Sequence, residues 1–509
     1  MKKCLGVLLA VCLLPIFVAC NASTDDPVTF LPQEEQTSDT QPGSDTTDGG
    51  TQDTGETLGS DTPGTSGTSN PATSGGDTQD KTPNFNGAEF KILSRQTTLR
   101  DFSVEQQGST PIERAVYARN TAMENRFNIK LTVEPVNGDG WEAFYNQYYG
   151  QIASSTQNVS LVTGKLDLCS YMAVRGLTYD LRQLSDLKLT ENWWIQSAHE
   201  AYGIEGKLYV ALGDATHTIY ESMEVVFVNE TLARTHLAHN GTPIDLYDLV
   251  ESGGWTWESF VLYTESVSQQ GNDPTYGLVT NDVGAIALPT GMDVTVAQKQ
   301  SNERWGFGAT TDFQLRYDHI KAFLTQYDEV YYQLNETDSE TVGNQLFTAG
   351  RALFYTQRLG AGATLCAGMP EGHTLGVLPF PKYDSAQSGY RTPLRSDVTA
   401  LTVPKNVRNS EMTGVVIEAL AQYGYETIRP EHWNSVLEGY LANADQNAML
   451  TTVREGVTAS FDMAYSHSLG DSYSIVPGML STGKSFADYY SANVSTWREN
   501  LQYLYAALG

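Results

Sequence analysis

The stretch that decides the fold class runs from EFKILS at residues 89–94, through PIERAVYARNTAMENRF at 111–127, to IKLTV at 129–133. The first and last segments have the alternating or branched apolar residues of strands, and the middle one repeats apolar residues at helical spacing behind Pro111. A strand, a helix and a second strand in succession indicate parallel pairing across a crossover helix. The chain is therefore expected to have an α/β architecture.

Two further strands are expected downstream. LDLCS at residues 166–170 is interpreted as a third short strand that ends in a polar and aromatic loop. VVFVN at 225–229 is unusually apolar for such an acidic protein, which predicts a strand buried on both faces.

Length and composition exclude several classes of protein. The chain has 509 residues, which suits two or three domains, and its mean hydropathy of -0.33 excludes a protein with many membrane spans. It carries 31 basic and 60 acidic residues, a net charge of -29. Such a charge repels phosphate backbones, so general nucleic-acid binding is not expected.

The first twenty residues predict export. Lys2 and Lys3 precede an apolar run at residues 5–19, which is short for a membrane span and is interrupted by Pro15. The run ends in FVAC, which resembles a bacterial lipobox. That resemblance implies a signal peptide at 1–19, a lipid on Cys20, and a protein anchored to the cell membrane and facing the outside. Soluble secretion is the main alternative.

A tether is expected next, at residues 20–86. Residues 21–80 hold twelve Asp or Glu, no Lys or Arg, and long Gly/Ser/Thr/Pro tracts. Low hydrophobicity with charge of one sign predicts disorder. Residues 81–509 retain 29 basic and 48 acidic residues, so the part expected to fold is acidic too.

Five segments in order resemble one family, the extracellular solute-binding proteins of ABC importers of the carbohydrate class that includes maltose-binding proteins. They are GIEGKLY at 203–209, EVVFVNE at 224–230, GWTWESF at 254–260, FTAGRALF at 347–354 and GVLPFPKY at 376–383. The resemblance covers about 88–509. It implies a solute-binding domain at 87–509 with a two-lobe, periplasmic-binding-protein-like fold of type II and a ligand cleft between the lobes. Lobe one would hold about 88–220 and 403–445, and lobe two about 222–395 with much of the C-terminal helical part.

The resemblance also implies a site. In such sheets ligands meet the loops beyond the carboxyl ends of strands. The candidate ligand-binding residues are therefore Ser94, Arg95 and Gln96 after the first strand, Tyr171 after the third, Thr216, Tyr220 and Glu221 before the crossing, and Tyr355 and Arg358 from lobe two.

The implied function is capture of an extracellular solute, with an oligosaccharide as the expected ligand and the permease subunits of an ABC importer as partners. A peptide or polyol ligand stays open. No catalytic residue, cofactor or metal is expected. The alternative is a surface glycan-degrading enzyme or a glycan-binding adhesin, because a chain with 60 acids does not exclude a catalytic pair of carboxylates.

Several other residues allow two readings. Three tryptophans are candidates for stacking on a sugar, although aromatic residues more often pack in a core, namely Trp193, Trp194 and Trp305. Trp257 is expected to pack in a core, in a helix whose N-cap is Thr256. His236 and His239 are three residues apart without a third ligand, which favours structural or surface histidines over a metal site. We expect Cys169 and Cys366 to be free, buried thiols and not to form a disulfide with each other.

Overall fold

The computed structural model describes residues 82–509 except 105–107, 137–140, 155–157, 240, 268–270, 272, 334–338 and 442. The described residues belong to one compact unit. The predicted signal peptide, the lipid on Cys20 and the tether up to residue 81 lie outside the described residues.

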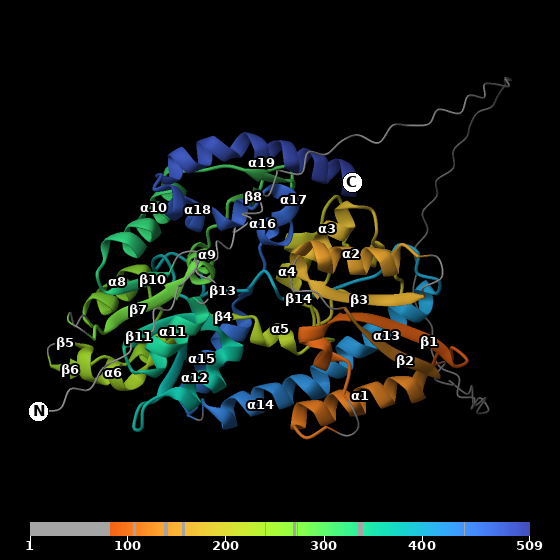
Figure 1. Ribbon diagram of the computed structural model, residues 1–509, viewed down its shortest axis with the longest axis horizontal. Coiled ribbons are helices and arrows are strands. Elements are labelled where there is room, and N and C mark those ends of the chain that lie inside the picture. The colour runs from red at the N-terminus through yellow and green to blue at the C-terminus, as the bar shows by residue number, and fades with distance from the viewer. Residues whose placement is uncertain are drawn as a thin grey trace, which may run out of the picture. The chain divides into compact units, whose positions relative to one another are not determined.

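The first sheet contains four strands in the order β14-β3-β1-β2 (Figure 1). β1 pairs in parallel with both β2 and β3, whereas β14 runs antiparallel to β3. This pairing confirms the parallel sheet predicted from the strand, helix and strand at 89–133. The bounds are β1 (Ala88–Arg95), β2 (Ile129–Val136), β3 (Val159–Lys165) and β14 (Thr399–Thr402).

Helix α1 (Pro111–Phe127) joins β1 to β2 and begins with a complete capping box. The Thr110 hydroxyl accepts a hydrogen bond from the Glu113 N–H, and the Glu113 carboxylate accepts one from the Thr110 N–H at 2.9 Å. Asn128 ends the helix in the left-handed conformation, with φ of 47°. The local signals alone therefore fix both ends of this helix.

The strand expected at residues 166–170 is wrong. These residues begin helix α3 (Leu166–Val174), and the strand is the preceding β3. Leu166, Cys169 and Met172 are all buried and recur at helical spacing, so one face of the helix packs on β3 and β14. Other helices of this lobe are α2 (Trp141–Ile152), α13 (Ser410–Tyr423) and α14 (Arg429–Gly439), the last two joined by a π-helical segment (Gly424–Ile428).

The second sheet has five strands in the order β10-β7-β11-β4-β12. β7 is parallel to β10 and β11, whereas β4 is antiparallel to β11 and β12. Every residue of β4 is buried, which agrees with the prediction for 225–229. The bounds are β4 (Glu224–Asn229), β7 (Tyr276–Asn281), β10 (Val330–Gln333), β11 (Ala352–Arg358) and β12 (Leu375–Leu378).

An aromatic core lies under the second sheet. The fully buried Trp255 ring lies 5.5 Å from both Phe260 and Phe354. Thr256 caps α8 as predicted, and Trp257 packs on Phe260, as expected for a core residue. The helices that pack on this sheet or on one another are α6 (Glu230–His236), α7 (Leu246–Glu251), α8 (Trp257–Glu265), α9 (Asp282–Gly291), α10 (Thr311–Gln326), α11 (Ser339–Thr348), α12 (Gly362–Gly368) and α15 (Ala444–Glu455).

The C-terminal helices are divided between the lobes. α16 and α17 pack on α3, α18 packs on α9 and α10, and the long α19 contacts both groups (Figure 1). Their bounds are α16 (Phe461–Ala464), α17 (Ser466–Leu469), α18 (Ile475–Thr482) and α19 (Phe486–Leu508).

The remaining α-helices and strands are α4 (Gln196–Tyr202), α5 (Thr218–Glu221) and the short strands β5 (Ala238–His239), β6 (Thr242–Pro243), β8 (Ala297–Lys299), β9 (Trp305–Phe307), β13 (Thr392–Pro393) and β15 (Val457–Thr458).

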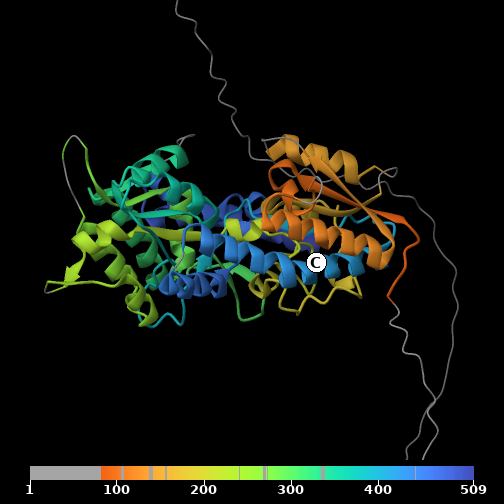
Figure 2. The ribbon, with the colours of Figure 1, turned by 90° about the horizontal axis from the view of Figure 1, so that it is seen from below.

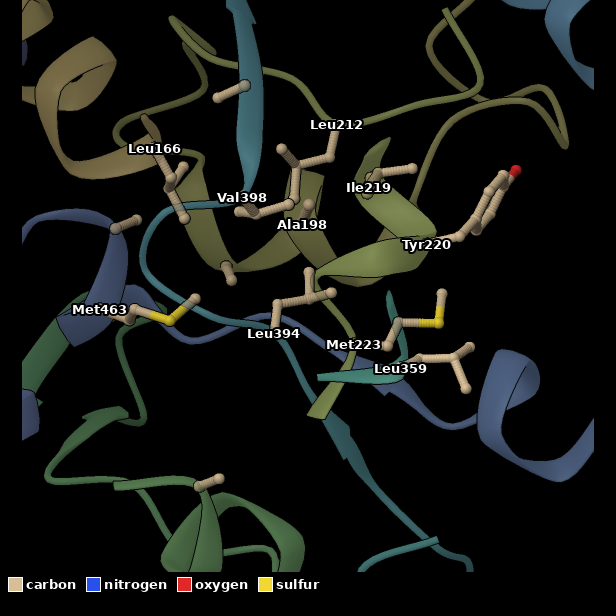
Figure 3. Close-up of a cluster of buried hydrophobic side chains, with 14 of the residues drawn as sticks. Leu166, Ala198, Leu212, Ile219, Tyr220, Met223, Leu359, Leu394, Val398 and Met463 are labelled. Atoms are coloured by element: carbon tan, nitrogen blue, oxygen red, sulfur yellow. The ribbon is translucent and has the colours of Figure 1, made fainter. Parts of the chain in front are cut away.

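The two sheets form two lobes, which Figure 2 shows from below with the orange early elements in one lobe and the green middle elements in the other. Two crossing segments, just before β4 and just before β14, connect the two sheets, and the chain crosses again among the C-terminal helices. β14 begins at Thr399, so the chain returns to the first sheet before residue 403. Met223 and Leu394, on the two crossing segments, form an isolated β-bridge. Figure 3 shows both in a buried apolar cluster with Leu359 and Val398. A shared core therefore joins the lobes.

Candidate ligand-binding site between the lobes

The facing edges of the two sheets carry charged residues. β1 ends at Arg95 and β11 ends at Arg358, while the antiparallel β4 begins at Glu224 beside the end of β11. The Arg95 guanidinium donates from Nη1 to the backbone oxygen of Asp397 at 2.8 Å. Strand ends from both lobes therefore meet at the segment that crosses before β14.

Arg395 is the centre of this meeting point. Its Nη1 lies 3.2 Å from Oε1 of Glu224, and its Nη2 donates to Oε1 of Glu340 at 2.6 Å. Its Nε lies 3.7 Å from Oδ1 of Asp397, and Nη1 also donates to the Gln357 side chain at 3.0 Å. We call six residues the interlobe cluster, namely Arg95, Glu224, Glu340, Arg358, Arg395 and Asp397.

Burial changes the acid–base behaviour of the cluster. Burial raises the pKa of Glu224 to about 7, although Arg395 opposes the shift. Burial alone would lower the pKa of Arg395, but Glu224, Asp397 and Glu340 outweigh it and raise that pKa. Arg395 therefore stays charged, and Glu224 takes up a proton more easily than an exposed glutamate.

A small cavity adjoins the cluster. It has a volume of about 90 Å³ and is lined by Glu224 and Arg395, by Ser396 and by Tyr473. Asp167, in the first turn of α3, is close enough for Asp397 to add to the rise in its pKa that burial causes. Ligand pockets usually measure about 300–1,000 Å³, so this cavity can hold only part of a saccharide.

Two of the predicted site residues, Arg95 and Arg358, belong to the interlobe cluster. Arg358 is 43% exposed and its Nη2 lies 3.6 Å from Glu340, so it faces the space between the lobes with a loose partner. Tyr355 is buried behind it, and its hydroxyl donates to the side-chain oxygen of Asn344 at 3.1 Å. Tyr355 therefore supports the edge of lobe two rather than facing solvent.

The other predicted residues are not members of the interlobe cluster, although Ser94 and Gln96 flank Arg95 in the chain. Ser94 and Thr216 are buried and Gln96 is exposed. Tyr171 lies on α3, against the rings of Tyr145 and His467. Glu221 pairs with Arg100, and the buried Tyr220 packs against His432 and Trp433. Which of these residues touch a ligand stays a prediction.

The sequence did not identify four members of the interlobe cluster as site residues, namely Glu224, Glu340, Asp397 and Arg395. Glu224 is the first residue of a strand that is buried throughout, which is a signal that its charge needs a partner. Its partner is 171 residues further along the chain, and no local pattern connects the two. Asp167 was missed because the third strand was placed at 166–170, after its true position.

The other candidate residues have structural partners. The indole N–H groups of Trp193 and Trp194 both donate to Glu418, and Trp305 stacks on Phe461 at 4.6 Å. Cys169 is buried and Cys366 half-buried, and both are free.

Among the described residues, no group of three or more His, Cys, Asp or Glu side chains is arranged to hold a metal ion. Within the same residues, no helix has the length and apolar character that crossing a membrane requires.

No protein-family model and no curated protein matches the chain. Solved structures do match. The galacto-N-biose/lacto-N-biose I-binding protein of an ABC transporter from Bifidobacterium longum, in complex with lacto-N-biose, is 12% identical with a TM-score of 0.57, and the match covers 82% of this chain and 98% of that one. An ABC substrate-binding protein from Listeria monocytogenes, in complex with cycloalternan, is 12% identical with a TM-score of 0.51 over 82% and 99% of the two chains.

A third structure, titled as a designed esterase, is 12% identical with a TM-score of 0.54, over 83% of this chain and 100% of that one. At these identities the likeness concerns the fold. The chain has the α/β, two-lobe fold of the maltose-binding-protein-like solute-binding proteins of ABC transporters.

Proposed function

We propose that this protein is a solute-binding receptor that captures an oligosaccharide between its lobes and delivers it to the permease of an ABC importer. The interlobe cluster carries the proposal. It contains three arginines and three carboxylates, so its formal charge is balanced although the folded part of the chain is strongly acidic. A neutral ligand with many hydroxyl groups suits such a site, because it uses both charged donors and charged acceptors.

The fold supports the same proposal. The matched solute-binding proteins from Bifidobacterium longum and Listeria monocytogenes were solved with saccharides, and the match spans nearly their whole length. Tyr473 lines the cavity beside Arg395 and can offer a ring to the apolar face of a sugar. A glycan-degrading enzyme is the second candidate that the sequence leaves open, and it would release product from a bound glycan.

The binding site can be tested with Arg95→Ala and Arg358→Ala. A glycan panel is first screened by thermal shift, since a ligand at a hundred times its Kd stabilises the fold by about 2.7 kcal/mol. Each substitution should then weaken binding of the selected saccharide by about 1.5–3 kcal/mol in calorimetry, because it removes a charged donor. The same samples are checked for released sugars, which would indicate an enzyme instead.

Arg234→Ala is the matched control. Arg234 lies on α6 of lobe two, is 59% exposed, and contacts the side chains of Glu230, Thr231 and Thr374. Its replacement should leave affinity unchanged. Affinity equal to wild type in folded Arg95→Ala and Arg358→Ala would remove this site, while a panel without any bound glycan would remove the proposed ligand class.

We also propose that a lipid on Cys20 holds the protein at the outer face of the cell membrane. Cys20→Ala should move the protein from the membrane fraction to the medium, or leave it with an uncleaved signal peptide, when fractions are probed with an antibody to residues 82–509. Cys4→Ala is the matched control and should leave the protein in the membrane. A processed Cys20→Ala protein that stays membrane-bound would show that something else anchors it.

A further inference from the structure

A second cavity, of about 310 Å³, lies between lobe one and α15. Its lining includes Asp214, Tyr220 on α5, Arg429 at the start of α14, and Arg454 near the end of α15. α15 packs on β12 and α7 of the second lobe. The cavity is therefore bounded by elements of both lobes, and its volume is within the range of small-molecule sites.

This cavity is separate from the interlobe cluster. Met223 lines it, whereas the next residue, Glu224, lines the small cavity beside Arg395. Successive side chains on an extended segment point to opposite faces, so the crossing segment divides the two cavities. In Figure 3, Tyr220, which lines this cavity, and Met463, which lines the small one, lie on opposite sides of the buried apolar cluster.

Two arginines, Arg429 and Arg454, and two acidic residues, Asp214 and the exposed Glu455, line the cavity. Arg429 pairs with Asp214 at 3.4 Å, but Arg454 forms no ion pair with any described residue. The Arg454 guanidinium lies over the Trp433 ring, 5.8 Å from its centre. Burial raises the pKa of Asp214 to about 7, so near neutral pH this carboxyl offsets less than one full positive charge.

A buried hydroxyl in the lining also lacks a partner. Tyr220 is 4% exposed, and its hydroxyl has no hydrogen-bond partner among the described residues. Its ring is held in place by His432 and Trp433, at 5.2 Å from each. A buried polar group without a partner costs about 1–3 kcal/mol, and a ligand that accepts its hydrogen bond would recover part of that cost.

We propose that this cavity binds a small organic carboxylate. The fork of donors on a guanidinium matches the two oxygens of a carboxylate, and the cavity lining contains two such groups, Arg429 from α14 and Arg454 from α15. The Tyr220 hydroxyl donates a further hydrogen bond, and the half-buried ring of Trp193, which also lines the cavity, packs on the apolar body of the ligand.

Calorimetric titration of the whole domain with benzoate, succinate and inorganic phosphate tests the proposal. Benzoate or succinate should bind to the wild-type protein, and Arg454→Gln should weaken that binding at least tenfold. Arg126→Gln is the matched control, since Arg126 is an exposed arginine of α1 outside the cavity, and it should bind as wild type does.

Tyr220→Phe provides a second test that does not depend on removing a charge. Because the hydroxyl has no partner, this variant should unfold at the same or a higher temperature than wild type, yet bind the carboxylate several-fold more weakly. The proposal is overturned if neither carboxylate binds, if phosphate alone binds, or if Arg454→Gln and Tyr220→Phe both keep wild-type affinity.

Discussion

Replacing Arg395 by methionine is expected to lower the free energy of unfolding by about 3–5 kcal/mol, the usual cost of removing one partner from a buried ion pair. Arg395 is the close cationic partner of Glu224, whose side chain is 2% exposed, and it also binds Glu340 from α11. Methionine keeps much of the volume but deprives the buried carboxylate of its closest counter-charge and leaves only the weaker influence of Arg358. Urea denaturation of the folded domain measures the change.

The pH dependence of this loss identifies its cause. The pKa of Glu224 is about 7 in the folded protein, above its ordinary 4.5. Between these two pH values the folded state binds the proton more tightly than the unfolded state, so the contribution of Glu224 to stability falls as the pH rises from 4.5 to 7. Without Arg395 that pKa rises further, so the loss of stability should be largest above pH 7 and shrink towards pH 4.5.

Arg391→Met, which breaks a more exposed pair with Asp293, should cost less than about 1 kcal/mol at either pH. An equal loss for Arg395→Met at both pH values would exclude Glu224 as the source.

Gly424→Ala is expected to destabilise the protein by about 3 kcal/mol, at the upper end of the range for overpacking. Gly424 begins the π-helical segment between α13 and α14 and has ordinary helical φ and ψ, so backbone strain is not the reason. A Cβ at this position would lie 1.7 Å from the backbone oxygen of Asp214. Neither backbone can move aside without separating the helix from the segment that leads to α5.

Gly439→Ala, at the end of α14, is the matched control. A Cβ there meets nothing within 4 Å, and alanine favours a helix over glycine by up to about 1 kcal/mol. The control should therefore be neutral or stabilising in the same urea titration. Equal effects of the two substitutions would show that the close approach of Gly424 to Asp214 does not limit the packing of this helix.

Much of the fold could be predicted because its signals are local. The helix entry at Pro111 and the apolar run at 225–228 in β4 each occupy a few consecutive residues. The segment at 166–170 was misread because its apolar residues fit a short strand as well as the first turn of a helix. Its next apolar residues, Met172 and Ala173, continue the helical spacing and favour α3.

The candidate site was less predictable because it is assembled from distant parts of the chain. Arg95 was identified because it follows the first predicted strand, and Arg358 because it follows the FTAGRALF segment; both are local features of the sequence. Arg395 was missed because it lies on a crossing segment, and its importance depends on Glu224 and Glu340, which are 171 and 55 residues away. Tyr220 was expected at the same site, but it lines the cavity that Met223 lines and not the one that Glu224 and Arg395 line.

The strand order also determines when each lobe can be completed. β3 at 159–165 pairs with β14 at 399–402, and β4 at 224–229 lies between β11 at 352–358 and β12 at 375–378. As the chain is made from its N-terminus, β4 has no neighbour in its sheet until β11 follows, and the first sheet lacks its last strand until residue 402. Pairings this distant in sequence slow folding, because long loops must close first. The two lobes are therefore finished late and almost together, and not one after the other in the order of synthesis.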